Sequence, residues 1–94
     1  ILSAQEAAEW GLVNRVVPDA DLLVEAEMLA GELATGPTGA FGGAKRLLHS
    51  GWTETLETQM ENETQSIAAR SKTEDGREGI TAFLEKRAPK FNGK

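Results

Sequence analysis

EGITAFLEKRAPKF, residues 78–91, carries the clearest structural signal in the sequence and lies near the end of the chain. Ile80, Phe83 and Leu84 recur at helical spacing, which predicts one short helix with an apolar stripe. Proline cannot continue a helix, so Pro89 predicts that this helix ends at about Lys86. The end of the helix therefore carries an aromatic ring and a cation three residues apart.

Phe83 and Lys86 are the first candidate site residues. Side chains at positions i and i+3 of a helix are neighbours, so the ring and the ammonium share one surface. Such a pair suits a ligand with a planar base and a phosphate, such as a nucleotide. The alternative is that Phe83 fills the core while Lys86 interacts with the helix dipole. The residues alone favour this alternative, because apolar stripes usually face a core.

Length and composition exclude several classes of protein. The chain has 94 residues, which predicts a single domain with a small core. A formal net charge of −5 argues against nucleic-acid binding. Without cysteine the chain has neither disulfides nor thiolate metal sites, and one histidine, His49, cannot form a His-rich metal site by itself. We therefore expect no metal ligands and no tightly bound cofactor.

Hydropathy and the first residues of the chain indicate where the protein is located in the cell. No apolar run approaches the ~20 residues that span a bilayer, and no signal peptide opens the chain. We therefore expect a soluble, cytoplasmic protein with no membrane partner. The chain begins at Ile1 without methionine, directly before a helix start, which suggests a piece of a longer protein.

The first segment predicts a short helix and then an extended stretch. Ser3 and Glu6 form a capping box for a helix from Ala4 to Trp10, and Gly11 suits the left-handed position after it. Trp10 is expected to pack inward. Residues 12–17 are rich in β-branched side chains and stop at a proline. They form either an extended connector or a strand whose sheet lies elsewhere.

The remaining sequence predicts four more helices and a tail. Asp19 or Asp21 is expected to cap the second, Thr38 the third, Thr53 the fourth and Thr73 the last. The second, fourth and last helices are expected at about 22–34, 54–70 and 74–86. Residues 88–94 are short, charged and expected to be a flexible tail. The chain is therefore predicted to be all-α, with about five helices.

Two other patterns could suggest chemistry but are better explained by structure. Gly39, Gly42 and Gly43 lack the spacing of a phosphate loop, so close packing of the third helix explains them better. Glu61 and Glu63 are two residues apart on a helix and do not face each other. A solvated face is the better interpretation of this pair, and no catalytic residue is assigned.

The order of these features resembles the enoyl-CoA hydratase/isomerase (crotonase) family. Residues 3–18, SAQEAAEWGLVNRVVP, are similar to a family segment with the pattern S-A-x-E-A-x-x-x-G-L-V-N-x-V-V-P. Residues 75–91, DGREGITAFLEKRAPKF, are similar to the family's C-terminal pattern D-x-x-E-G-x-x-A-F-L-E-K-R-x-P-x-F. The resemblance covers essentially the whole chain, and it indicates a family but no particular substrate.

The resemblance implies that residues 1–94 are the C-terminal helical region of such an enzyme, without its ββα spiral core. It implies a coenzyme A thioester as substrate, and roles in lid formation and in assembly with the spiral core and sister subunits as a trimer or dimer of trimers. The family's oxyanion hole and acid/base carboxylates lie in the spiral core, so this chain alone is expected to be inactive. Phe83 and Lys86 match positions that meet the CoA nucleotide, with Arg87 assisting.

A different class of function stays open. The long fourth helix has a sparse apolar face and would be better ordered against a partner surface. A free-standing helical interaction module without catalytic activity is therefore the alternative to an enzyme fragment. A small nucleotide-binding domain is disfavoured because the chain has no phosphate loop.

Overall fold

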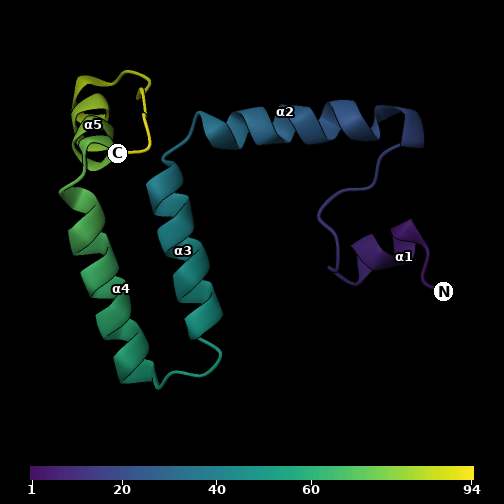
Figure 1. The fold of residues 1–94 in the computed structure, drawn as a ribbon, viewed down its shortest axis with the longest axis horizontal. Helices are drawn as coiled ribbons and strands as arrows, with labels where there is room; N and C mark the ends of the chain where they lie inside the picture. Colours follow the sequence, from purple (N-terminus) through teal and green to yellow (C-terminus); the bar gives the residue numbers. More distant parts are fainter. The chain divides into compact units, whose positions relative to one another are not determined.

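The structure, a computed structural model, describes residues 1–94, and its regular elements are all helices (Figure 1). Its elements are α1 (Ala4–Glu9), a 3-10 turn (Asp19–Asp21), α2 (Leu22–Ala34), α3 (Thr38–Ser50), α4 (Leu56–Ser71) and α5 (Glu74–Glu85). The prediction of an all-α chain with about five helices is confirmed. The chain forms two compact units, residues 1–31 and 32–94.

The first unit begins with the predicted capping box. The Glu6 N–H donates to Ser3 Oγ at 3.2 Å, and the Ser3 N–H donates to Glu6 Oε2 at 2.8 Å. The bonds from the Ser3 hydroxyl and N–H lower the pKa of the Glu6 carboxyl. Gly11 has φ +74° and ends the helix as predicted. Trp10 was expected to pack inward, which is wrong in this chain, because the residue is 73% exposed.

Residues 12–17 form the connector to α2 and pair with no strand. Arg15 ties this connector to α2 through an ion pair in which Nη1 lies 2.6 Å from Glu25 Oε2. Neither Asp19 nor Asp21 caps α2 with its side chain. Both instead belong to the 3-10 turn, in which the Asp21 N–H donates to the Pro18 carbonyl at 2.9 Å. The turn leads directly into α2, so the expected cap is not needed there.

Two of the other predicted helix starts need correction. Thr38 is the first residue of α3, and Pro37 occupies the N-cap without a side-chain hydrogen bond. The N-cap of α4 is Thr55 rather than Thr53, because Thr55 Oγ1 accepts from the Thr58 N–H at 3.2 Å. The Thr53 hydroxyl instead donates to the Ser50 carbonyl at 3.2 Å, within the turn after α3. Both threonines fit the preference for threonine at an N-cap, and the length of the turn after α3 determines which of the two caps the helix.

In the second unit α3 packs against α4, and α4 packs against α5. Gly43 of α3 is buried, and a Cβ placed there would lie 3.3 Å from Ser66 Oγ of α4. Gln59 of α4 donates to the Leu47 carbonyl at 3.1 Å, near the end of α3. The interpretation of the α3 glycines as a site of close helix packing is therefore confirmed for Gly43.

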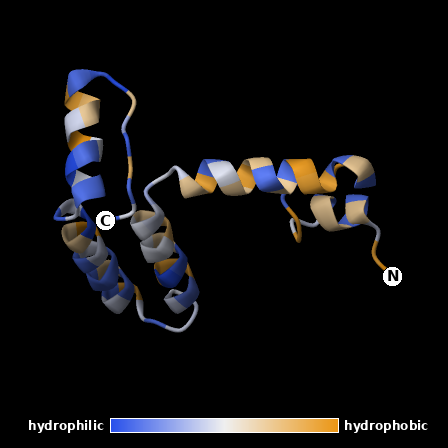
Figure 2. Ribbon diagram, turned by 45° about the horizontal axis from the view of Figure 1, so that its top comes forward, coloured by the Kyte–Doolittle hydropathy of each residue, from blue (hydrophilic) through white to orange (hydrophobic).

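Very little apolar surface is buried within either unit. Ala82 is the buried hydrophobic residue, at 1% exposure, while Trp52, Leu56 and Ile67 are 70% exposed or more. Figure 2 shows hydrophobic segments along α2 and α5, and a mostly hydrophilic α4. Burying one such large side chain is worth about 1.5–3 kcal/mol, so these surfaces favour contact with a further apolar surface. No helix combines the length and the hydrophobicity that crossing a bilayer requires.

Candidate functional site

The candidate site depends on how α5 begins. Thr73 caps the helix as predicted, with its Oγ1 accepting from the Gly76 N–H at 3.0 Å. The Thr73 hydroxyl donates to the Arg70 carbonyl at 2.7 Å, so the same side chain also closes the turn from α4. Glu74 and Asp75 follow in the first turn, where carboxylates interact favourably with the helix dipole. The start of α5 is thus held to the end of α4.

The helix ends at a left-handed residue, Lys86, with φ 54° and ψ 40°. The Lys86 N–H donates to the Phe83 carbonyl at 3.3 Å, and the Arg87 N–H donates to the Ala82 carbonyl at 3.0 Å. Glycine is the usual residue at such a position, because the left-handed region costs other residues roughly 1–2 kcal/mol. A lysine here is therefore a strained residue at a candidate binding position.

Both candidate residues are open to solvent in this chain. Phe83 is 82% exposed, so the ring does not fill a core formed by residues 1–94. Lys86 is also exposed and forms no ion pair within the chain. The ring and the cation are thus both exposed at the C-terminal end of α5, with Lys86 one residue beyond the helix. That the two side chains share one surface stays a prediction.

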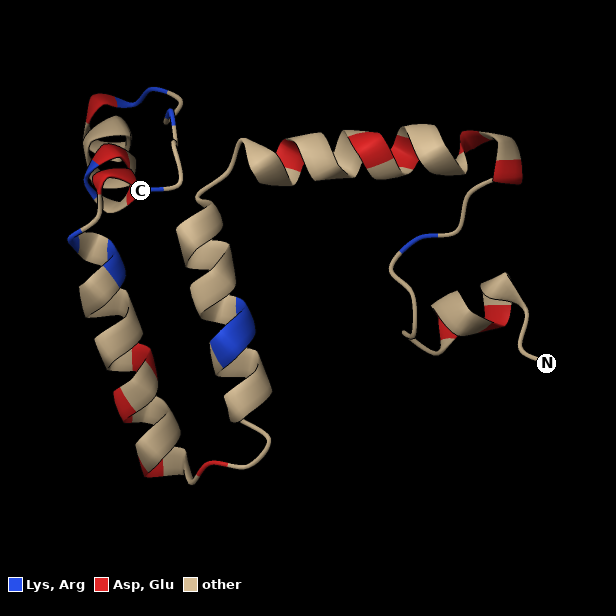
Figure 3. Ribbon diagram, in the orientation of Figure 1, with Lys and Arg blue, Asp and Glu red and all other residues tan.

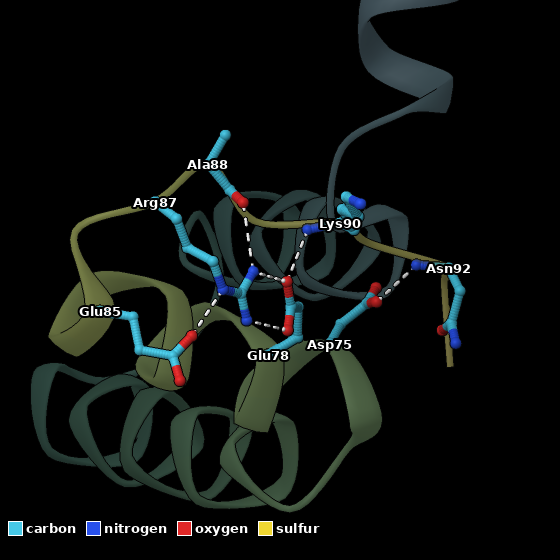
Figure 4. A network of polar contacts seen from close by, with 7 residues as sticks. All are labelled: Asp75, Glu78, Glu85, Arg87, Ala88, Lys90 and Asn92. Carbon is cyan, nitrogen blue, oxygen red and sulfur yellow. Dashed lines mark hydrogen bonds and ion pairs between the residues drawn. The ribbon is translucent and has the colours of Figure 1, made fainter.

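Arg87, by contrast, is engaged by carboxylates of α5 (Figure 4). Its Nη1 lies 2.6 Å from Glu78 Oε1 and its Nη2 lies 2.9 Å from Glu78 Oε2, a bidentate pair. Its Nε lies 2.6 Å from Glu85 Oε2. The Lys90 N–H also donates to Glu78 Oε1 at 2.7 Å. Sequence reasoning missed this pair because nine residues separate Glu78 from Arg87 and the left-handed turn lies between them.

The ion pair shifts the ionisation of both partners. Hydrogen bonds from the Arg87 guanidinium, and then from the Lys90 N–H, lower the pKa of Glu78 to about 2. The bonds from Glu78 and Glu85 raise the pKa of Arg87. Both side chains of the bidentate pair stay partly open to water, at 24% exposure for Glu78 and 39% for Arg87.

Acidification is therefore expected to open this ion pair. Because the pKa of Glu78 is lower in the folded chain, its contribution to stability is complete above the ordinary value of 4.5 and is lost as the pH falls toward about 2. An NMR titration of the side-chain carboxyl carbons measures this directly. Glu78 should titrate well below its ordinary value of 4.5, and a pKa above about 4 for Glu78 would contradict the ion pair.

Asp75 holds the end of the chain against α5. Its carboxylate accepts from the Asn92 N–H at 2.7 Å and from the Gly93 N–H at 2.9 Å, and the residue is only 7% exposed. The Asp75 N–H donates to the Lys94 carbonyl at 2.9 Å. Gly93 has φ +80°, a conformation that favours glycine. The sequence predicted a flexible tail at 88–94 and did not foresee these partners; how much the tail moves stays a prediction.

The other polar candidates are not brought together. Glu61 accepts from Gln65 Nε2 at 2.8 Å, whereas Glu63 accepts from Gln59 Nε2 at 3.1 Å. The two carboxylates thus have separate partners one helical turn away, in keeping with a solvated face. The structure contains no group of three or more His, Cys, Asp or Glu residues placed to hold a metal ion.

The blue segment in the middle of α3 marks its Lys and Arg residues (Figure 3). These basic residues line a hollow at the surface. Its volume is about 720 Å³, and it is lined by Gly42, Lys45, Arg46, Leu48, His49, Ser50 and Trp52. Trp52 is 89% exposed and Leu48 is 76% exposed. No buried polar group without a partner points into this hollow, so the end of α5 is the better candidate site.

Comparison with known proteins identifies the family. The model of the enoyl-CoA hydratase/isomerase family matches residues 1–94. The chain is 47% identical to the 1,2-epoxyphenylacetyl-CoA isomerase of Escherichia coli, over 99% of this chain and 36% of that protein. It is 39% identical to a probable enoyl-CoA hydratase of Rhodobacter capsulatus, with the same coverage of 99% and 36%.

A solved structure agrees with these relatives. The crystal structure of an enoyl-CoA hydratase from Bacillus anthracis matches with a TM-score of 0.84 and 38% identity, over 98% of this chain and 36% of that one. The chain thus spans little more than a third of the length of the proteins it matches. From the match over its whole length, the chain belongs to the enoyl-CoA hydratase/isomerase family.

Proposed function

We propose that this chain is the C-terminal helical part of an enzyme that acts on acyl-CoA thioesters. Its roles there are to complete the pocket for the CoA nucleotide, to cover the active site and to contact other subunits. The observation that carries the proposal is the exposed pair of Phe83 and Lys86 at the end of α5. The relatives named above as an isomerase and a hydratase both carry CoA in their names, which supports the substrate class.

In this proposal the two residues divide the recognition of the nucleotide. The Phe83 ring packs against the adenine, and the Lys86 ammonium pairs with a phosphate as a point charge. Arg87 contributes less than its charge suggests, because its guanidinium already binds Glu78 and Glu85. A charged group that is already paired offers fewer free donors to a phosphate.

The roles in covering the site and in assembly are supported by the exposed apolar side chains. Leu22, Leu23 and Val24 are 61–69% exposed on α2, and Leu56 and Ile67 are 70–71% exposed on α4. Surfaces of this kind are typical of protein–protein contacts. In a longer protein they would pack against the spiral core and against sister subunits, and the residues of both units would then lose exposure.

Binding of CoA to the chain tests the nucleotide contact. Phe83 and Lys86 form only part of a pocket, so binding should be weak and require millimolar CoA. At that concentration we expect the backbone amide signals of Phe83 and Lys86, which contact the ligand, to shift more than those of α4. Substitution of Phe83 by alanine should weaken these shifts, while Leu56→Ala, at another exposed apolar residue, should leave them unchanged. Equal shifts along the whole chain, or none at α5, would contradict the proposal.

The isolated chain is expected to be inactive. Hydration or isomerisation of an enoyl thioester requires polarisation of its carbonyl by donors in a water-excluded site, and this stabilisation usually contributes most of the rate enhancement. The chain presents no such enclosed set of donors at the end of α5. Incubation with crotonyl-CoA should give no more product than buffer, and robust turnover would show that catalytic groups are present in residues 1–94.

A free-standing helical interaction module is the second candidate, favoured by the same exposed apolar side chains. Sequencing upstream of the codon for Ile1 separates the two. An in-frame extension that encodes a glycine-rich oxyanion segment supports the enzyme, whereas an in-frame stop codon followed by a start signal favours the module. In the second case CoA should have no effect on the signals of Phe83 and Lys86.

A further inference from the structure

One face of α5 binds the end of the chain. Its residues are Asp75, Glu78, Gly79 and Ala82, whose spacing of three and four places them on one side of the helix. We call it the tail-binding face. Residues 87–94 turn back along it in the opposite direction, as the ribbon shows (Figure 1).

Three contacts hold the tail to this face in sequence order. Glu78 binds the Arg87 side chain and the Lys90 N–H. The Phe91 ring lies over Gly79, where an added Cβ would be 3.6 Å from the ring. Asp75 then accepts from the N–H groups of residues 92 and 93. The chain after the turn is therefore anchored at two carboxylates with an aromatic ring between them.

Lys86 is the residue around which the chain reverses. Its left-handed conformation is unfavourable for a lysine, so something other than local preference must hold it. The backbone bonds at the turn involve only the last turn of α5. Two side chains of α5 bind Arg87 directly after the turn, Glu85 and Glu78, and Glu78 alone of the two also binds the Lys90 N–H.

We propose that Glu78 is a positioning residue for the Phe83–Lys86 pair. By holding Arg87 and Lys90 against α5, its carboxylate keeps Lys86 in the left-handed turn and so fixes the position of the Lys86 backbone at the end of the helix that carries Phe83. Glu78 itself does not touch the ligand. This inference rests on the proposed CoA contact and names the residue that holds the contacting residues in place. Residues that are already ordered lose less conformational freedom on binding than mobile ones.

The first test reads the turn without any ligand. In Glu78→Gln the amide cannot form the charged bidentate bond, so φ of Lys86 should change from positive to negative. The intraresidue couplings and NOEs of Lys86 measure this change by NMR. Glycine adopts positive φ without strain. In the double variant Lys86→Gly with Glu78→Gln, residue 86 should therefore stay left-handed. Glu57→Gln, at an exposed carboxylate of α4, is the matched control and should leave Lys86 unchanged.

The second test reads the binding of CoA. Glu78→Gln should weaken CoA binding by about 3- to 10-fold, the loss expected when one or two ordered groups become mobile. Lys86→Ala should weaken it at least as much, and Glu78→Gln added to Lys86→Ala should produce no further loss. A role of Glu78 in stability alone would instead lower the affinity of both backgrounds equally. Arg87→Gln removes the same ion pair from the other side, together with the bond to Glu85. If Glu78→Gln fails to fold, Arg87→Gln should release Lys86 from the left-handed turn in the ligand-free measurement.

The outcomes separate this inference from the function on which it rests. If Lys86→Ala weakens CoA binding while Glu78→Gln and Arg87→Gln do not, the positioning role is overturned and the CoA contact stands. A left-handed Lys86 that persists in Glu78→Gln overturns the positioning role as well. If neither Lys86→Ala nor Phe83→Ala affects CoA binding, the proposed function fails, and the positioning role toward CoA fails with it.

Discussion

Replacing Gly76 with alanine is expected to destabilise the second unit by about 2–3 kcal/mol, the cost of forcing an extra methyl group into a packed site. A Cβ at this position would lie 2.2 Å from the Arg70 carbonyl oxygen and 3.0 Å from the Ser71 Cα. Both are backbone atoms, so no side chain can rotate away to make room. The turn between α4 and α5 would have to shift, and the Thr73 cap with it.

The sign of this effect is opposite to that expected from helix propensity. Gly76 lies within α5, where alanine would by itself be more favourable than glycine by about 1 kcal/mol. Gly31 of α2 provides the matched control, because a Cβ there meets nothing within 4 Å. Gly31→Ala should therefore stabilise its helix by up to about 1 kcal/mol. Urea unfolding followed by circular dichroism compares the two, and a stabilising Gly76→Ala would contradict the packing of this turn.

Replacing Asp75 with alanine is expected to release the end of the chain. The carboxylate is nearly buried and accepts two backbone N–H bonds, at 2.7 Å and 2.9 Å. Hydrogen bonds to a charged group are worth about 1.5–3 kcal/mol each, and the loss of one partner leaves the N–H groups unsatisfied. We therefore expect a local loss of about 2–4 kcal/mol in the binding of the tail.

Hydrogen exchange at the tail measures this loss. In Asp75→Ala the amides of Asn92 and Gly93 should exchange at rates close to those of an unfolded peptide, while amides within α4 keep their protection. Asp75→Asn retains one carbonyl oxygen and should give an intermediate result. If Asn92 and Gly93 exchange freely in the unaltered chain, the tail is as loose as its sequence predicts and the bonds to Asp75 do not persist in solution.

The helices themselves were predictable from sequence because their signals are local. Apolar spacing, the capping pattern at Ser3 and Glu6, and Thr73 before two acidic residues predicted α1, α2 and α5 within a residue or two. The start of α4 was placed two residues early because both Thr53 and Thr55 satisfy the same preference. Only the geometry of the turn after α3 decides which hydroxyl meets the helix.

Burial was the weakest part of the prediction. Trp10 and the bulky residues of the helical stripes look like core residues in sequence, yet they are exposed here. Hydrophobicity indicates that a side chain favours burial, and it does not say which surface covers it. Phe83 illustrates the same point, since the sequence alone favoured a core position and the resemblance to the enoyl-CoA hydratase/isomerase family favoured a binding one.

The helical class of this chain, the ends of its capped helices and its family can all be read from the amino-acid sequence, because propensities, caps and motifs act over a few neighbouring residues. Three further features emerge only in the folded chain: the reversal at a left-handed Lys86, the bond of Glu78 to Arg87 across this turn, and the binding of the last residues by Asp75. The contacts of Glu78 with Arg87 and of Asp75 with the last residues join positions nine to eighteen residues apart. The path of the backbone brings them together, and no helical or strand period marks them in the sequence.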